Sequence, residues 1–233
     1  MDLTAAVHRS TPDPARPERT ARALLRAPAR ALCLVAALAA GPAAADGDNC
    51  AGKSAADAQA LVKDTTDKLF AAVDADRERI RADSAYARQV IDQYVGPHVD
   101  LESSSRLVLG KYWREATPEQ RERFVHEFHQ LILRTYTTAV TEYTGISIEY
   151  LPQRDDGQAS MVTVRTRIPQ QGGPGVSVNY RLHCNDGRWM LIDVTIEGVS
   201  MVTTYRSQFA GEINRAGIDG LIEALERKNK EGA

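Results

Sequence analysis

Hydrophobic residues recur every three or four positions between residues 55 and 145, which is the spacing of amphipathic helices. Ser54 and Asp57 can cap the first helix, and Thr117-Pro118-Glu119-Gln120 contains the pattern of a capping box. Four helices are therefore predicted, over about 55–73, 83–95, 101–113 and 118–144, with a charged break at 74–81 and a stop at Gly96-Pro97.

After Gly145 the hydrophobic residues alternate with polar ones, which is typical of strands. Short turns rich in Gly, Asn and Asp separate four such segments, over about 146–150, 162–168, 176–182 and 189–197. Helical spacing returns near Ser200, breaks at Gly217 and ends at Lys230. This order predicts an α+β fold, with helices packed against one face of a curved four-stranded antiparallel sheet.

The last predicted strand, beginning at Trp189, is nearly all apolar. A strand without alternation must be covered on both faces or must line an apolar space. Gly198 allows a turn at its end, and Val199, Met201 and Val202 then extend the apolar surface. This stretch predicts part of the wall of an apolar cavity.

The N-terminal 45 residues have the character of a cleaved secretory signal. They hold six arginines, then the apolar run from Ala31 to Ala40, then small residues before Asp46. The run has about half of the ~20 residues that a membrane span needs. We therefore expect a signal over 1–45, a flexible leader over 46–54 and one soluble domain outside the cytoplasm. That domain comprises helices over 55–145, the sheet over 146–197 and C-terminal helices over 198–230.

Charge argues against a nucleic-acid partner. Removal of residues 1–45 leaves 23 basic and 28 acidic residues, a formal net charge of −5. No block of Lys and Arg follows one face, as nucleic-acid binding would require.

Two cysteines, Cys50 and Cys184, remain in the predicted mature chain. An oxidising compartment permits one disulfide between them. The alternative is that Cys50 lies in a frayed tail and never meets Cys184.

Histidine spacing suggests a metal site only weakly. His126 and His129 are three residues apart, with Glu122 and Glu127 nearby, but no third ligand is evident. On a helical wheel both histidines lie off the apolar stripe, so a solvated face is favoured. His98, beside Gly96-Pro97, is interpreted as a loop residue.

Ser200, His183 and Asp193 could form a catalytic triad, but the sequence around Ser200 lacks the second glycine of a nucleophile elbow. Asp193 could also act as a general base in an apolar pocket. The alternative is a structural carboxylate facing Arg165 or Arg181 on a neighbouring strand. The structural interpretation of Asp193 is favoured.

Three segments in order carry a resemblance to a known family. They are LVLGKYWREATPEQRERF (107–124), EGVSMVTTYRSQF (197–209) and AGIDGLIEAL (216–225). They resemble the periplasmic phospholipid-binding component of the Mla (maintenance of lipid asymmetry) ABC transport system, also called the toluene-tolerance family. The resemblance covers roughly residues 55–230. It implies a sheet similar to that of nuclear transport factor 2, with helices enclosing a pocket for acyl chains.

The resemblance implies a monomeric lipid carrier without a catalytic residue, metal or cofactor, whose cargo is phospholipid. Its expected partners are an outer-membrane lipoprotein–porin complex and the MCE-domain ring of an inner-membrane ABC transporter. The residues expected to contact lipid are Val199, Met201, Val202, Ile192, Val194, Ile196, Val178, Tyr180, Leu109 and Tyr112. Two alternatives stay open: an isomerase or hydrolase on the same scaffold with Asp193 as base, and a docking protein without ligand.

Overall fold

The computed structural model describes residues 53–142, 147–153, 160–170 and 172–231, which belong to one structural unit. The predicted signal, most of the predicted leader and the predicted turn Asp155-Asp156-Gly157 between the first two strands lie outside the described residues. So does the predicted end of the fourth helix at Gly145.

Three helices open the described chain: α1 (Ala55–Ala75), α2 (Arg77–Ala82) and α3 (Ser84–Val95). The predicted capping box forms, because the Asp57 amide donates to Ser54 Oγ and the Ser54 amide donates to the Asp57 carboxylate. The predicted break at 74–81 is wrong over most of its length. Residues 77–82 form α2 because Ile80 is buried in a cluster with side chains of α1 and α3.

A short 3₁₀ helix, η1 (Gly96–His98), leads into α4 (Leu101–Leu109), α5 (Tyr112–Glu115) and α6 (Pro118–Glu142). The predicted helix over 101–113 is divided at Gly110, whose φ of 57° an ordinary residue rarely adopts. The predicted capping box at Thr117 is present, since the Gln120 amide donates to Thr117 Oγ1 and the Thr117 amide donates to Gln120 Oε1.

The sheet is antiparallel throughout, with its strands in the order β1-β2-β3-β4-β5. The strands are β1 (Glu149–Tyr150), β2 (Met161–Ile168), β3 (Val176–Asn185), β4 (Arg188–Ile196) and β5 (Val199–Ser200). The prediction contained four strands and missed β5. Glu197 and Gly198 both have positive φ, at 48° and 80°, which closes a two-residue hairpin and lets Val199 pair with Ile196.

The chain ends in α7 (Met201–Lys230), which begins at a cap where the Thr203 amide donates to Ser200 Oγ. The predicted break at Gly217 is confirmed: its φ of 75° and ψ of 179° bend the helix. No described helix has both the length and the apolar character that a bilayer span requires.

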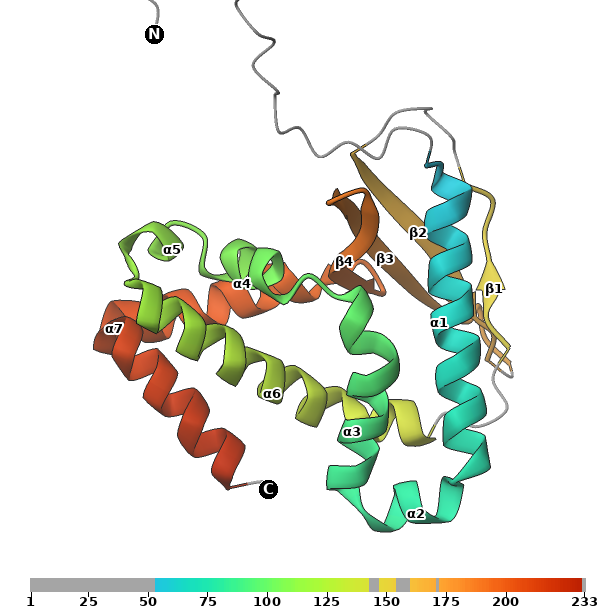
Figure 1. Ribbon diagram of the computed structural model, residues 1–233, viewed down its shortest axis with the longest axis horizontal. Helices are drawn as coiled ribbons and strands as arrows, with labels where there is room; N and C mark the ends of the chain where they lie inside the picture. The colour runs from blue at the N-terminus through green and yellow to red at the C-terminus, as the bar shows by residue number, and fades with distance from the viewer. Residues whose placement is uncertain (1–52, 143–146, 154–159, 171, 232–233) are drawn as a thin grey trace, which may run out of the picture. The chain divides into compact units, whose positions relative to one another are not determined.

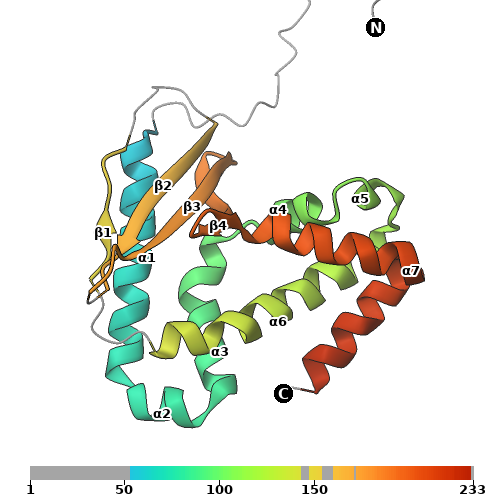
Figure 2. The ribbon, with the colours of Figure 1, turned by 180° about the vertical axis from the view of Figure 1, so that it is seen from behind.

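Helix α1 lies across one face of the sheet, and α6 packs against both α3 and α7 (Figures 1 and 2). Alternate residues of β2 and β3 meet α1 in one buried cluster that includes Val62, Val164 and Trp189. A second cluster joins α4, α5, α6 and both halves of α7 around Phe124. The predicted fold class, helices packed on an antiparallel sheet, is confirmed.

Candidate functional site: an apolar cavity

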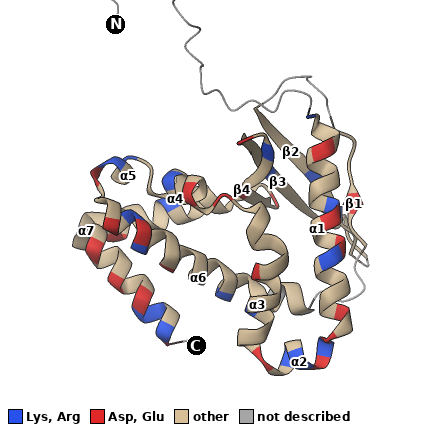
Figure 3. Cartoon of the chain, viewed as in Figure 1, with Lys and Arg blue, Asp and Glu red and all other residues tan. Residues whose placement is uncertain are grey.

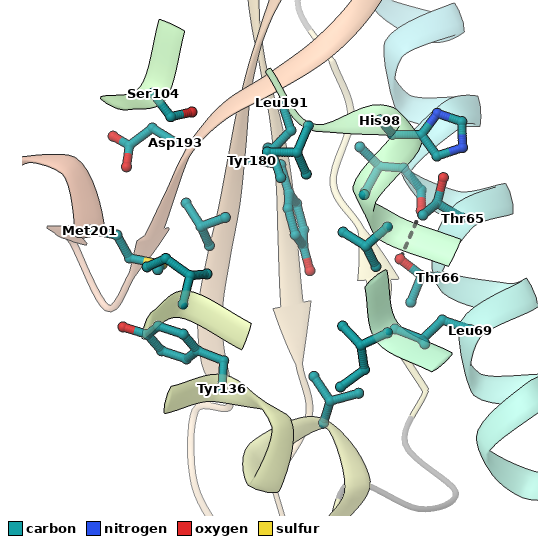
Figure 4. A pocket seen from close by; sticks show the side chains of 18 of the residues that line it. Thr65, Thr66, Leu69, His98, Ser104, Tyr136, Tyr180, Leu191, Asp193 and Met201 are labelled. Atoms are coloured by element: carbon teal, nitrogen blue, oxygen red, sulfur yellow. Dashed lines mark hydrogen bonds between the residues drawn. The ribbon is translucent and has the colours of Figure 1, made fainter. Parts of the chain in front are cut away.

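A cavity of about 390 Å³ lies between the helices and the inner face of the sheet (Figure 4). Its walls come from α1, α3, η1, α4, α6, β2, β3, β4 and the first residues of α7. The lining is predominantly apolar. Figure 4 shows Tyr180 projecting from β3 into the space, with Met201 and Tyr136 on one side and Thr65, Thr66 and Leu69 on the other.

The sheet wall depends on a β-bulge in β4. Tyr180 pairs with Val194 and Leu182 pairs with Leu191, so Ile192 is an extra residue between these pairs. Both Leu191 and Ile192 consequently line the cavity. The bulge explains why hydrophobic and polar residues do not alternate along β4. From its sequence, this strand was expected to be covered on both faces or to line an apolar space.

The helical walls supply the same kind of apolar surface. Helix α1 contributes side chains between Leu61 and Phe70, and α6 contributes side chains between Phe128 and Val140. Helix α3 contributes Ile91 and Val95. Sequence analysis did not assign any of these residues to the site. Their three- and four-residue spacing is the signal that also marks an ordinary core face, so periodicity alone could not distinguish them.

Two tyrosines bring hydroxyl groups into the lining. Burial raises the pKa of Tyr180 to about 12, and burial also raises the pKa of Tyr136 to about 12, with the nearby Tyr205 adding to that shift. Both phenols are therefore neutral at physiological pH. Thr65 Oγ1, on α1, is buried and has no hydrogen-bond partner among the described residues.

The charged side chains of the lining are paired. Asp92 of α3 and His129 of α6 lie 3.0 Å apart, and Asp193 of β4 lies 3.3 Å from Arg181 of β3. His126 is exposed and lies beside Glu127 on the same helix. Among the described residues no three potential metal ligands gather. The cavity thus presents a predominantly apolar surface with paired charges at two points.

Seven of the ten residues predicted to contact lipid line the cavity: Val178, Tyr180, Ile192, Val194, Ile196, Met201 and Val202. This placement is compatible with the predicted contact, which stays a prediction. Leu109 and Tyr112 do not line it, because they are buried in the helical cluster around Phe124.

Val199 is also absent from the cavity lining, and the prediction that it lies in the cavity is wrong. It pairs with the lining residue Ile196, so the two side chains share a face of the sheet. However, β5 is a two-residue edge strand, and Val199 is left 61 % exposed.

The three residues of the considered triad do not assemble. Ser200 Oγ donates to Asp193 over 2.7 Å, but His183 Nε2 lies 2.8 Å from Asp100. Asp193 also accepts a bond from the amide of Val202, and therefore fixes the start of α7. Of its two considered partners it faces Arg181, while Arg165 donates to the carbonyl of Pro152.

Asp100 is a second buried carboxylate, and sequence analysis did not single it out. It caps α4 by accepting from the Ser103 amide, and it also accepts from Asn185 of β3. Burial alone would raise the pKa of Asp100, but the bonds from Ser103 and His183 outweigh it and hold the pKa below its usual value. Asp100 thereby joins α4 to the sheet.

Cys184 of β3 is fully buried and disulfide-bonded. Cys50 lies outside the described residues, so the pairing of Cys50 with Cys184 stays a prediction.

Comparison with known proteins identifies the family. The family model described as MlaC protein matches residues 63–227. The chain belongs to the MlaC family. The resemblance inferred from the three sequence segments is therefore confirmed.

Named relatives agree with this assignment. The chain is 31 % identical over 170 residues to the intermembrane phospholipid transport system binding protein MlaC of Haemophilus influenzae, covering 72 % of this chain and 79 % of the relative. It is 29 % identical over 161 residues to the toluene tolerance protein ttg2D of Pseudomonas putida, covering 68 % and 74 %. The phospholipid-binding protein of Ralstonia solanacearum, solved in complex with a phospholipid, superposes with a TM-score of 0.70 at 30 % identity, covering 75 % of this chain and 97 % of that one.

Proposed function

We propose that this chain is a periplasmic phospholipid carrier that contains no enzymatic step. It would move lipid between an outer-membrane lipoprotein–porin complex and the MCE-domain ring of an inner-membrane ABC transporter, and so maintain outer-membrane lipid asymmetry. The observation that carries the proposal is the apolar cavity of about 390 Å³ in a member of the MlaC family. The phospholipid complex of the Ralstonia solanacearum relative supports the same cargo.

The energetics of acyl chains explain what such a cavity would do. Two chains of a common phospholipid hold about 28 methylene groups, and each costs about 0.8 kcal/mol to expose to water, so unshielded transfer costs on the order of 20 kcal/mol. Lining side chains such as those of Leu69 and Val194 would replace the apolar environment of the membrane. Loading and unloading could then be nearly balanced in free energy.

The proposal of a carrier, rather than of an isomerase or hydrolase, is supported by the contacts of Asp193. Its carboxylate is occupied by Arg181, Ser200 and the Val202 amide, which gives it a structural role. The proposed periplasmic location is supported by the name of the Haemophilus influenzae relative, an intermembrane transport protein, and by the signal predicted over residues 1–45.

Native mass spectrometry of protein purified without added lipid tests the proposed cargo. We expect a co-purifying mass of a diacyl phospholipid. Val194→Glu should abolish it, because a carboxylate in an apolar wall would be buried without a partner. Thr195→Glu is the matched control, since the next residue of β4 pairs with Asn179 and points to the opposite face of the sheet.

Folded protein that carries no lipid, or an equal lipid content in both glutamate variants, would contradict the carrier. Circular dichroism on each variant ensures that only folded protein is compared. A carrier should also move labelled phospholipid between two vesicle populations without altering its mass, whereas an enzyme would change that mass.

A further inference from the structure

Two carboxylates of the described chain line the cavity, Asp92 and Asp193, and they differ in their bonding. Oδ2 of Asp193 accepts a hydrogen bond from Ser200 Oγ and lies 3.3 Å from Arg181. Oδ1 of the same residue accepts from the Val202 amide. Both oxygens of Asp193 are therefore occupied, and only 3 % of its side chain is exposed. This carboxylate has no acceptor left for a ligand.

Asp92, on α3, keeps one oxygen open: Oδ1 lies 3.0 Å from Nε2 of His129, on α6, but Oδ2 has no hydrogen-bond or ion-pair partner among the described residues. Arg88 is the one other charged residue of α3, and it donates to Ser84 instead. Figure 3 shows α3 as a mostly tan ribbon, whereas charged residues of both signs follow one another along α7. Oδ2 of Asp92 is thus an unused acceptor in a sparsely charged part of the molecule.

Asp92 lies where the apolar lining meets solvent. Both Asp92 and His129 line the cavity, yet their side chains are 44 % and 20 % exposed. Ile91 and Val95, on the same helix as Asp92, provide apolar lining beside this pair. Gly96 leaves room for the carboxylate, because an added Cβ would meet Asp92 Oδ1 at 2.6 Å. In a mostly apolar site, a few placed polar groups of this kind fix the orientation of a ligand and its specificity.

We propose that Asp92, held in place by His129, forms a headgroup subsite that favours phospholipids with an ammonium N–H, such as phosphatidylethanolamine. The inference rests on the proposed carrier function. With the acyl chains in the cavity, an ammonium N–H can donate to Asp92 Oδ2 while His129 keeps Oδ1. Such charge-assisted hydrogen bonds are stronger than neutral ones. A trimethylammonium group has no N–H to donate, and a glycerol headgroup has no positive charge.

The test loads the full chain from vesicles that contain three dioleoyl phospholipids in equal amounts, with ethanolamine, choline and glycerol headgroups. Their acyl chains and phosphates are the same, so the apolar lining and the repulsion between phosphate and Asp92 act on all three alike. Native mass spectrometry then counts each lipid in the re-isolated protein. We expect the ethanolamine lipid to exceed each of the others by about fivefold, the upper end for a partly exposed ion pair. Three lipids bound in equal amounts would overturn the subsite.

Asp92→Asn removes the charge while keeping the size of the side chain. We expect the ethanolamine lipid to fall to the level of the other two. Asp64→Asn is the matched control, because it removes the same charge from α1, where Asp64 is exposed, pairs with Lys68 and does not line the cavity. The control should keep the preference. An equal loss of all three lipids in Asp92→Asn, as expected of a pair that only braces α3 against α6, would overturn the subsite, and so would a lost preference in the control.

Methylation of the lipid tests the hydrogen bond without any variant, and keeps the inference falsifiable where Asp92→Asn fails to fold. Dioleoyl lipids with no, one, two or three methyl groups on the ammonium nitrogen keep the positive charge but lose one N–H per methyl. We expect most of the fivefold fall in binding at the third methyl, which removes the last N–H. A steady decline along the series would assign the preference to headgroup size, and an absent decline would assign it to charge alone. Either result overturns the hydrogen bond to Asp92.

Failure of the subsite and failure of the carrier give different results. A folded chain that takes up none of the lipids overturns the carrier. A chain that holds phospholipid without regard to its headgroup overturns the subsite alone. Circular dichroism on the wild type and on each variant ensures that only folded protein is compared.

Discussion

The chain builds two apolar regions from similar residues, and only one of them is filled. Around Phe124, side chains of α4 to α7 interdigitate, and the rings of Phe124 and Phe209 meet edge to face with centroids 5.8 Å apart. Between α1, α6 and the sheet, equally apolar side chains leave a cavity of about 390 Å³. The contrast shows that the position of a hydrophobic residue in the fold, rather than its type, decides whether it packs into a core or lines a cavity.

The energetic consequence follows from packing. A side chain in the filled cluster loses contacts on every side when it is truncated, so its removal leaves a new void. A side chain on the cavity wall already borders empty space in lipid-free protein, and has fewer contacts to lose. The two regions should therefore respond differently to the same kind of substitution.

Phe124→Ala should have the largest effect on stability. Phe124 is fully buried, and its truncation should lower the free energy of unfolding by about 3–5 kcal/mol. Leu101→Ala, on the cavity wall and outside the buried clusters, should cost less than about 2 kcal/mol in lipid-free protein, below the usual range for a packed leucine. Urea denaturation of delipidated protein measures both, and equal losses would contradict the distinction between the two regions.

Gly217→Ala should lower the free energy of unfolding through the filled region and leave the lipid content unchanged. The backbone at Gly217 has a conformation that residues with a side chain rarely adopt, so alanine should cost about 2 kcal/mol. No atom lies within 4 Å of an added Cβ there, which leaves backbone strain as the cause. The control is Gly211→Ala, in a regular part of α7, which should be neutral or stabilising. Loss of bound lipid in folded Gly217→Ala protein would contradict the independence of the two regions.

Asp100→Asn should lower the free energy of unfolding by about 1–2 kcal/mol at neutral pH, because it weakens the hydrogen bonds that connect α4 to the sheet. The pKa of Asp100 is held below its usual 3.8, so its stabilising contribution is complete above that value and is lost as the pH falls through the lowered pKa. The difference in unfolding free energy between wild type and variant should therefore be constant above about pH 5 and shrink below about pH 4. A difference that does not depend on pH would contradict this role of the carboxylate.

Val194→Phe should have the smallest effect on stability, less than about 1 kcal/mol in delipidated protein, because the larger ring extends into empty space rather than into a filled core. The same substitution should reduce the lipid content strongly. Thermal unfolding and lipid extraction on one preparation give the two quantities. A large loss of stability would show that the cavity wall is as tightly packed as the core.

Local signals in the sequence were sufficient for much of the fold. The capping boxes at Ser54 and Thr117 and the break at Gly217 depend on residues close together in the chain, so their patterns carried the information. The segment around Ile80 was misread as a break, because its helix depends on burial against α1 and α3. Strand β5 was missed because its two residues directly precede a helix and were read as part of the helical pattern that begins near Ser200.

The site was less predictable because it depends on packing between distant segments. Leu109 and Leu69 have the same helical periodicity, yet one lies in the filled cluster and the other lines the cavity. The bulge at Ile192 shifts the register of β4 in a way that no sequence pattern indicated. For Val199, the shared face with Ile196 did not bring it into the cavity, since its strand lies at the edge of the sheet.

Photocrosslinking with a phospholipid that carries a diazirine in its acyl chain tests the central claim most directly. After loading and irradiation, peptide mapping should find the label on the cavity walls, in residues 61–70 of α1 and 191–196 of β4. Residues of the filled cluster that do not line the cavity, such as Leu109, Phe124 and Leu221, should stay unlabelled. Label that is confined to those residues, or to strand residues that point away from α1, would contradict the assignment of the cavity as the lipid site.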